Sequence, residues 1–141
     1  MDILDGVYVA GMSLAGCIGR AVYKGLPDSF RVRLEAVAPL SLKPGWIWLH
    51  AVSVGELLLA VGILGKLRDA GRHIHITTGT QVGLDLLKAR LSTWEDGSER
   101  CVTGGGFPLD DPDGLESFFE APPSAFIALE TELWPNLFRE L

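Results

Sequence analysis

This 141-residue chain has little cysteine, no long apolar run and few basic residues in its second half. The two cysteines, Cys17 and Cys101, are too few for a disulfide framework and too far apart for a redox pair or a zinc knuckle, so we expect reduced thiols. The uncharged stretch over residues 6–19 is too short to span a bilayer and lacks the charged start of a secretory signal. These absences exclude a secreted disulfide scaffold and a membrane-spanning helix.

Charge is distributed unevenly along the chain. Residues 92–141 carry two Lys and Arg against eleven Asp and Glu, which excludes a nucleic-acid groove there. Residues 1–91 carry ten against seven, and Arg20, Lys24 and Arg33 are among the basic residues that follow the uncharged stretch. This pattern suits docking on an anionic membrane surface, and it fits an ordinary packed helix with a solvated end equally well.

Histidine is scarce too, with His50, His73 and His75 only. The last two alternate in "RHIHITT", which places them on one face of a strand, where they could bind a metal ion. No third ligand lies nearby in the sequence, so we expect no metal site.

Apolar runs and helical periodicity alternate from residue 46 onward. Short aromatic and β-branched runs predict strands, and apolar residues at spacings of three and four predict helices. The predicted strands cover residues 46–51, 73–78 and 124–130. The predicted helices cover residues 54–70, 80–91 (with Val82, Leu86, Leu87 and Leu91 as its apolar stripe) and 111–121, and a last one begins near Pro135.

The segment "RCVTGGGFPLD" is ambiguous. Its first residues predict a brief strand over 101–103, and the three glycines that follow should weaken any strand that passes through them.

Strands that alternate with helices at this spacing predict an α/β fold, with a parallel sheet and helices on both faces. Ligands of such sheets bind beyond the carboxyl ends of the strands. Four polar segments follow predicted strands and should converge there: residues 53–56, 78–80, 108–110 and 130–132.

The glutamate in "SVGE" has two interpretations. Ser53 and Glu56 match the capping box, in which each side chain accepts a hydrogen bond from the other residue's backbone N–H. A carboxylate at a strand end can also serve as a general base, although a helix N-terminus favours its anionic form. The sequence leaves both open.

The other acidic residues also have structural interpretations. Glu130 and Glu132 alternate at a predicted strand end, so only one would face the cleft and the other could cap the next helix. Asp110 lies in "LDDPDG", which has turn chemistry of its own.

Four ordered motifs, "WIWLHAVSVGE", "TTGTQVG", "FPLDDP" and "LETELWPN", resemble the amino-terminal domain of 3-deoxy-D-manno-octulosonic acid (Kdo) transferases, enzymes of lipopolysaccharide assembly. The resemblance covers residues 46–141. It implies the Rossmann-like amino-terminal half of a two-domain GT-B glycosyltransferase, inverting, metal-independent and without a cofactor. Such an enzyme transfers Kdo from CMP-Kdo to the lipid A precursor (lipid IVA), as a peripheral protein at the cytoplasmic face of the inner membrane.

The resemblance also implies residue roles. Glu56 matches the general base that deprotonates the acceptor hydroxyl, and Glu130 matches a second acidic residue of the cleft. The remaining candidates would bind the acceptor or shape the loops: Ser53, Gly55, Thr78, Thr80, Asp110 and Glu132. Two departures stand out, Val82 where the family has threonine and "TGGG" where it has an ordinary strand.

We therefore expect residues 1–45 to form a helical, membrane-proximal segment and residues 46–141 to form the acceptor-binding domain. CMP-Kdo would bind mainly a carboxyl-terminal domain that these residues do not include, so the chain alone should be inactive. Two alternatives remain: a GT-B transferase with another envelope substrate, and a stand-alone module that binds lipid or protein.

Overall fold

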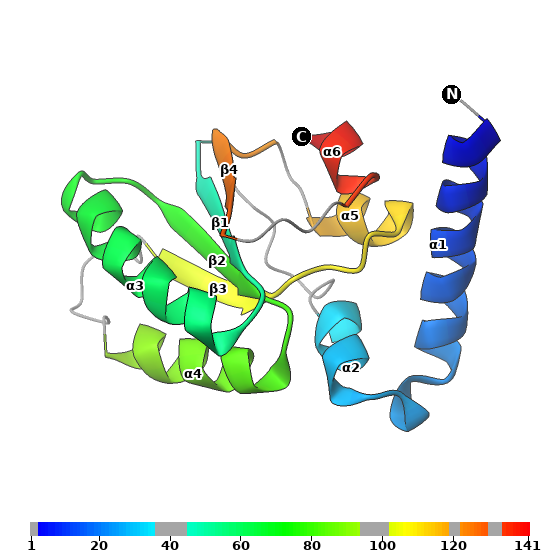
Figure 1. The fold of residues 1–141 in the computed structure, drawn as a ribbon, viewed down its shortest axis with the longest axis horizontal. Coiled ribbons are helices and arrows are strands. Elements are labelled where there is room, and N and C mark those ends of the chain that lie inside the picture. The colour runs from blue at the N-terminus through cyan, green and yellow to red at the C-terminus, as the bar shows by residue number, and fades with distance from the viewer. Residues whose placement is uncertain (1–2, 36–44, 94–101, 119–121, 130–133) are drawn as a thin grey trace.

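The computed structural model describes residues 3–35, 45–93, 102–118, 122–129 and 134–141, and its centre is a parallel β-sheet (Figure 1). The strands are β1 (Ile47–Ala51), β2 (Ile74–Thr78), β3 (Val102–Gly106) and β4 (Ala125–Ala128). They pair in the order β3-β2-β1-β4, and all described pairs are parallel. The sheet therefore has all its described carboxyl ends at one edge.

Helices cover both faces of the sheet, which confirms the predicted fold class. They are α1 (Ile3–Ala21), α2 (Asp28–Glu35), α3 (Val54–Asp69), α4 (Gln81–Ser92), α5 (Pro112–Phe118) and α6 (Leu137–Glu140), with a 3₁₀ turn, η1 (Tyr23–Gly25). Leu57 and Leu64 of α3 and Leu87 of α4 pack in one core. Leu115 of α5 and Leu137 of α6 pack in the core of the opposite face.

The sequence of β1 explains why it is central. Leu49 belongs to the core under α3 and α4, and Trp48 belongs to the core under α5 and α6. Both residues are fully buried. A strand buried on both faces has no polar side to alternate with, which is why "IWLHA" is an almost continuous apolar run.

Strand β3 corrects a prediction, because it runs through the glycines to Gly106 instead of ending near residue 103. Its register with β2 pairs Thr78 with Gly106. A Cβ on Gly104 would lie 2.8 Å from Leu87 of α4, and one on Gly106 would lie 2.5 Å from the carbonyl oxygen of Val32 in α2. The glycines thus let helices pack close to the strand, and this packing outweighs their weak strand propensity.

The predicted stripe of α4 was wrong at its first residue. Val82 is 68% exposed, whereas Leu84 is buried beside Leu87. The buried residues of α4 are Gly83, Leu84 and Leu87, and Val82 lies off the face that they form. Likewise α6 begins at Leu137, two residues after Pro135.

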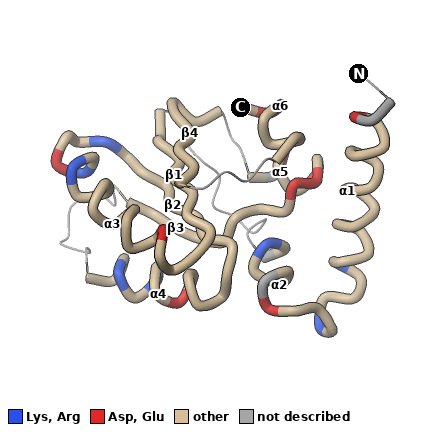
Figure 2. Tube along the Cα trace, in the orientation of Figure 1, with Lys and Arg blue, Asp and Glu red and all other residues tan. Residues whose placement is uncertain are grey.

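Helices α1 and α2, with η1 between them, make up most of the described part of the first 45 residues, and α1 contacts both α2 and α5. The outward side of α1 is apolar, with Val7, Leu14 and Ile18 at least half exposed. In Figure 2 the tube of α1 is uncharged between Asp5 and Arg20. Within the described ranges, every helix is too short or too polar to cross a membrane.

Candidate functional site at the carboxyl edge of the sheet

The chain order of the strands reverses direction beside β1. Strands β2 and β3 lie on one side of β1 and β4 lies on the other, so the carboxyl ends of β1 and β4 flank the switch point where α/β folds bind ligands. There the backbone N–H of Leu129 donates to the carbonyl of His50 at 3.0 Å. Glu130 and Glu132, the predicted acidic pair, lie outside the described residues, so their alternation stays a prediction.

Glu56 lies at this edge and forms the predicted capping box with Ser53. Its Oε2 accepts the backbone N–H of Ser53 at 2.7 Å, and the Ser53 hydroxyl accepts the backbone N–H of Glu56 at 3.5 Å. The carboxylate is half-buried at the start of the 16-residue helix α3. The contact with Ser53 fixes the direction of the carboxylate at the end of β1.

The neighbouring loop candidates shape the same edge. The Thr78 hydroxyl donates to the carbonyl of Val52 at 3.2 Å, which joins the ends of β2 and β1. Thr80 caps α4 by accepting the backbone N–H of Gly83 at 3.1 Å. Gly55 is exposed in the first turn of α3. The structure thus places Ser53, Thr78 and Thr80 in the framework of two adjacent strand-to-helix turns.

His50 is buried below this edge in a ring stack. Its centroid lies 3.8 Å from that of Phe107, and its Nδ1 is 3.0 Å from the hydroxyl of Thr77. Its Nε2 is buried and has no hydrogen-bond partner in the structure. Burial lowers the pKa of His50 to about 3, so the ring is neutral at physiological pH. A neutral, enclosed imidazole is no candidate for an acid at neutral pH.

In the sequence, Arg33 is only one of several basic residues that follow the uncharged stretch. The structure places its guanidinium over the ring of Trp134, with its centre 4.5 Å from the ring centroid. Trp134 belongs to "ETELWPN", so a residue from α2 meets the last predicted motif. Because more than 90 residues separate the two in the chain, only the tertiary packing reveals this contact.

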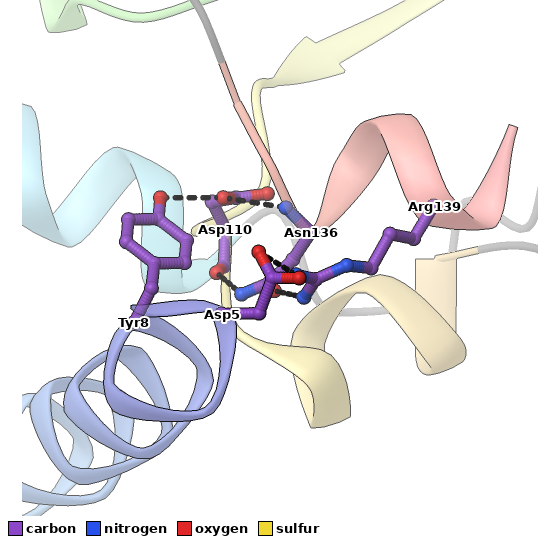
Figure 3. A network of polar contacts seen from close by, with 5 residues as sticks. All are labelled: Asp5, Tyr8, Asp110, Asn136 and Arg139. Carbon is purple, nitrogen blue, oxygen red and sulfur yellow. Dashed lines mark hydrogen bonds and ion pairs between the residues drawn. The ribbon is translucent and has the colours of Figure 1, made fainter. Parts of the chain in front are cut away.

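Asp110 is fully buried and binds segments from both ends of the chain (Figure 3). Its carboxylate accepts the hydroxyl of Tyr8 at 2.6 Å and the backbone N–H groups of Asn136 and Leu137 at 3.1 and 2.8 Å. Its backbone carbonyl accepts the side-chain amide of Asn136 at 2.7 Å. Asp110 therefore holds the start of α6. Burial of Tyr8, together with the hydrogen bond from its hydroxyl to Asp110, raises the pKa of Tyr8 above its ordinary value.

Two ion pairs extend this network along α1. Asp5 contacts Arg139 of α6 at 2.7 Å. Arg20 contacts the buried Asp111 at 2.9 Å. The sequence did not indicate Tyr8, Arg20 or Asp111 as site residues. Asp110 and Asp111 lie in the acidic second half of the chain, where two adjacent carboxylates give no sign that they are buried.

The histidine pair has structural partners. The Nδ1 of His75 lies 2.8 Å from the hydroxyl of Thr103, and His73 packs against Trp46. Burial lowers the pKa of His75 to about 4. Among the residues that the structure describes, no group of three or more His, Cys, Asp or Glu could hold a metal ion.

Comparison with known proteins decides the family. The family model described as 3-deoxy-D-manno-octulosonic-acid transferase (kdotransferase) matches residues 28–141, from the start of α2 to Leu141. This chain belongs to the Kdo transferase family. The match is to the amino-terminal domain of these transferases, so it includes the capping-box turn, the Asp110 segment and Trp134.

Three relatives illustrate the similarity to Kdo transferases. The chain is 37% identical over 101 residues to 3-deoxy-D-manno-octulosonic acid transferase of Haemophilus influenzae, an alignment of 70% of this chain and 22% of the relative. It is 32% identical to a probable mitochondrial Kdo transferase of Arabidopsis thaliana, aligned over 70% of this chain and 22% of the relative. It is 31% identical to the Kdo transferase of Aquifex aeolicus, aligned over 66% of this chain and 24% of the relative. The chain thus spans about a fifth to a quarter of these relatives' length. No solved structure matches.

Proposed function

We propose that this chain is the acceptor-binding part of an inverting GT-B transferase that moves Kdo from CMP-Kdo to the lipid A precursor (lipid IVA). The observation that carries the proposal is the position of Glu56, a carboxylate held at the end of β1 beside the switch point of a parallel sheet. The family match supports the class of reaction, since relatives in three organisms bear the name of Kdo transferase.

In this proposal Glu56 is the general base, supported by its place at the end of β1. In the proposed step the acceptor hydroxyl gives its proton to the Glu56 carboxylate, its oxygen bonds to the anomeric carbon of Kdo, and the bond from that carbon to the CMP oxygen breaks, so that CMP leaves with the electron pair. The contact of Oε2 with Ser53 holds the carboxylate in one orientation. A helix N-terminus favours the anionic form of a carboxylate, so the proposed step requires that the bound substrates exclude water from this place.

The other candidate residues would act by shaping this edge. Ser53 and Gly55 form the turn that presents Glu56, and Thr78 and Thr80 form the adjacent turn. Asp110 fixes Asn136, directly after the "ETELWP" segment. We keep Glu130 as the second acidic residue of the cleft and Glu132 as an acceptor or loop residue.

The direct test is a transfer assay with labelled CMP-Kdo and lipid IVA. The full two-domain protein should transfer Kdo, and the 141-residue chain alone should transfer none, because CMP-Kdo would bind mainly the other domain. Transfer of a different sugar by the two-domain protein would favour another envelope substrate. Binding of lipid by the 141-residue chain, with no sugar transfer by the two-domain protein, would favour a module that binds lipid without catalysis.

We further propose that α1 docks the domain on the cytoplasmic face of the inner membrane as a peripheral contact. One side of α1 is anchored to the domain through Tyr8 and Arg20, while Val7, Leu14 and Ile18 point outward. An exposed apolar helix side next to basic residues binds anionic bilayers by burial of apolar area and by charge attraction.

Vesicle sedimentation tests this docking with a matched pair of variants. Val7→Asp should weaken binding to vesicles of 30% phosphatidylglycerol in phosphatidylcholine by about tenfold or more, because it puts a charge on the exposed side of α1 that the bilayer would bury. Val82→Asp is the control, since Val82 of α4 is as exposed (68%) as Val7 (66%) and lies on the far side of the sheet. Equal binding of both variants would refute docking through α1.

A further inference from the structure

Arg33 reaches the candidate site because α2 packs unusually close to β3. Val32, its neighbour in α2, is buried, and a Cβ on Gly106 would lie 2.5 Å from the Val32 carbonyl oxygen. Only a residue without a side chain permits this approach. Gly106 is also the last residue of β3, so the contact brings α2 to the carboxyl edge of the sheet.

The guanidinium of Arg33 is held by aromatic rings. Its centre lies 4.5 Å from the centroid of Trp134 and 5.7 Å from that of Phe107, and these two rings lie 5.4 Å apart. Cation–π contacts of this kind stabilise the charge and restrict the side chain. The half-buried Arg33 is therefore ordered before any ligand arrives.

The same guanidinium borders the turns that carry the site. A Cβ on Gly79, directly after β2, would lie 3.2 Å from Nη2 of Arg33 and 3.6 Å from Val52, which precedes the capping box of Glu56. Gly79 thus leaves room for the guanidinium between the ends of β1 and β2. Helices α3 and α4 begin at these turns, and their N-termini add partial positive charge to the same edge.

Two opposite charges act on the buried ring of His50 from this edge. Arg33 lowers the pKa of His50 and Glu56 raises it, while burial is the largest cause of the overall fall. The guanidinium and the candidate base therefore lie in one electrostatic environment.

We propose that Arg33 binds an oxyanion of a sugar substrate, a phosphate or a carboxylate, and so places the sugar beside Glu56. The proposal rests on the proposed function and adds a binding residue to the same site. A guanidinium is suited to the task because its planar fork can donate two parallel hydrogen bonds to such a group. It carries five N–H donors in a fixed planar arrangement.

Inorganic phosphate is the probe that tests the site without any transfer reaction. The 141-residue chain is titrated with sodium phosphate against sodium chloride at matched ionic strength, with NMR observation of the Gly79 amide and the Arg33 Nε–H. We expect saturable shifts at both in the wild type, and the apparent phosphate affinity read from the Gly79 amide should be at least tenfold weaker in Arg33→Gln. Arg31→Gln is the control, because Arg31 lies on the same helix in an exposed ion pair with Asp28. Absent shifts, or equal shifts in both variants, would overturn the proposal.

Kinetics of the two-domain transferase identify the substrate that carries the oxyanion. Arg33→Gln should raise the KM of one substrate by about 10- to 100-fold with a smaller change in kcat, and Arg33→Lys should recover part of the loss. If the wild type and Arg33→Gln have the same acceptor KM when the acceptor is dephosphorylated, the group that Arg33 binds is an acceptor phosphate. If instead the donor KM rises, the group belongs to the donor. Unchanged KM values for both substrates would overturn the proposal.

The two failures are distinguishable. A wild-type two-domain protein that transfers no Kdo contradicts the proposed function, and the phosphate titration then still decides whether Arg33 is an oxyanion site. Transfer by the wild type together with a silent titration contradicts the Arg33 proposal alone.

Discussion

Replacement of Asp110 should be among the most destabilising changes in the domain. Asp110→Ala leaves the backbone N–H groups of Asn136 and Leu137 without their acceptor in a buried place. Each unsatisfied buried donor costs about 1–3 kcal/mol, and the half-buried Tyr8 hydroxyl loses a charged acceptor as well. We therefore expect a loss of about 3–5 kcal/mol, a large share of the ~5–15 kcal/mol that holds a typical domain together.

Urea unfolding followed by circular dichroism measures this loss, with the midpoint and the slope fitted together. Asp110→Asn keeps one acceptor oxygen and should cost less than Asp110→Ala, and Tyr8→Phe should cost about 1–2 kcal/mol. In the Asp110→Ala background Tyr8→Phe should cost almost nothing, because the partner of the hydroxyl is gone. Asp113→Ala is the control, since the Asp113 side chain is 80% exposed.

Either of two results would contradict a structural role for the Asp110 carboxylate. The first is an Asp110→Ala variant within about 1 kcal/mol of wild type, which would mean that the hydrogen bonds of Asp110 do not hold α6. The second is an equal cost of Tyr8→Phe with and without Asp110, which would mean that the two side chains do not interact.

Two further predictions concern stability. Burial lowers the pKa of His50 to about 3 and that of His75 to about 4, whereas the pKa of an unfolded histidine is near 6.5. As the pH falls from about 6.5 toward 4, the unfolded chain therefore binds two protons that the folded chain does not bind. These two residues together lower the unfolding free energy by up to about 2.7 kcal/mol per pH unit. His75→Asn should remove about half of that slope in urea titrations between pH 7 and 5, and an unchanged slope would contradict the cause. Gly106→Ala should cost about 1–3 kcal/mol through its clash with Val32, whereas Gly62→Ala, in open space within α3, should stabilise by about 0.5–1 kcal/mol; equal effects would contradict the close packing of α2.

The alternation of strands and helices was predictable because β1 and β2 are buried on both faces and α3 has a clear start and stop. Ser53 and Glu56 form the capping box that marks the beginning of α3, and Gly71, with a φ of +70°, follows its end. The local signals and the tertiary structure agree there. The convergence of the described strand ends followed from parallel pairing alone.

The features that the sequence predicted wrongly or did not reveal depend on contacts between segments that are distant in the chain. The glycines of β3 weaken a strand locally, and only the closeness of Leu87 and Val32 shows why Gly104 and Gly106 are tolerated. The burial of Asp110 and the placement of Arg33 likewise follow from packing of α1, α2 and α6 that no local pattern encodes.

The role of Glu56 is tested most directly by the turnover of Glu56→Gln in the two-domain protein, with CMP-Kdo and lipid IVA as substrates. Glutamine can still accept the Ser53 N–H, so folding should change by no more than about 1 kcal/mol. It cannot take a proton from the acceptor, so kcat should fall by about 10²–10⁴-fold, while Glu116→Gln, at an exposed position of α5, should leave kcat unchanged. A Glu56→Gln enzyme that keeps kcat within about threefold of wild type would show that Glu56 only caps α3.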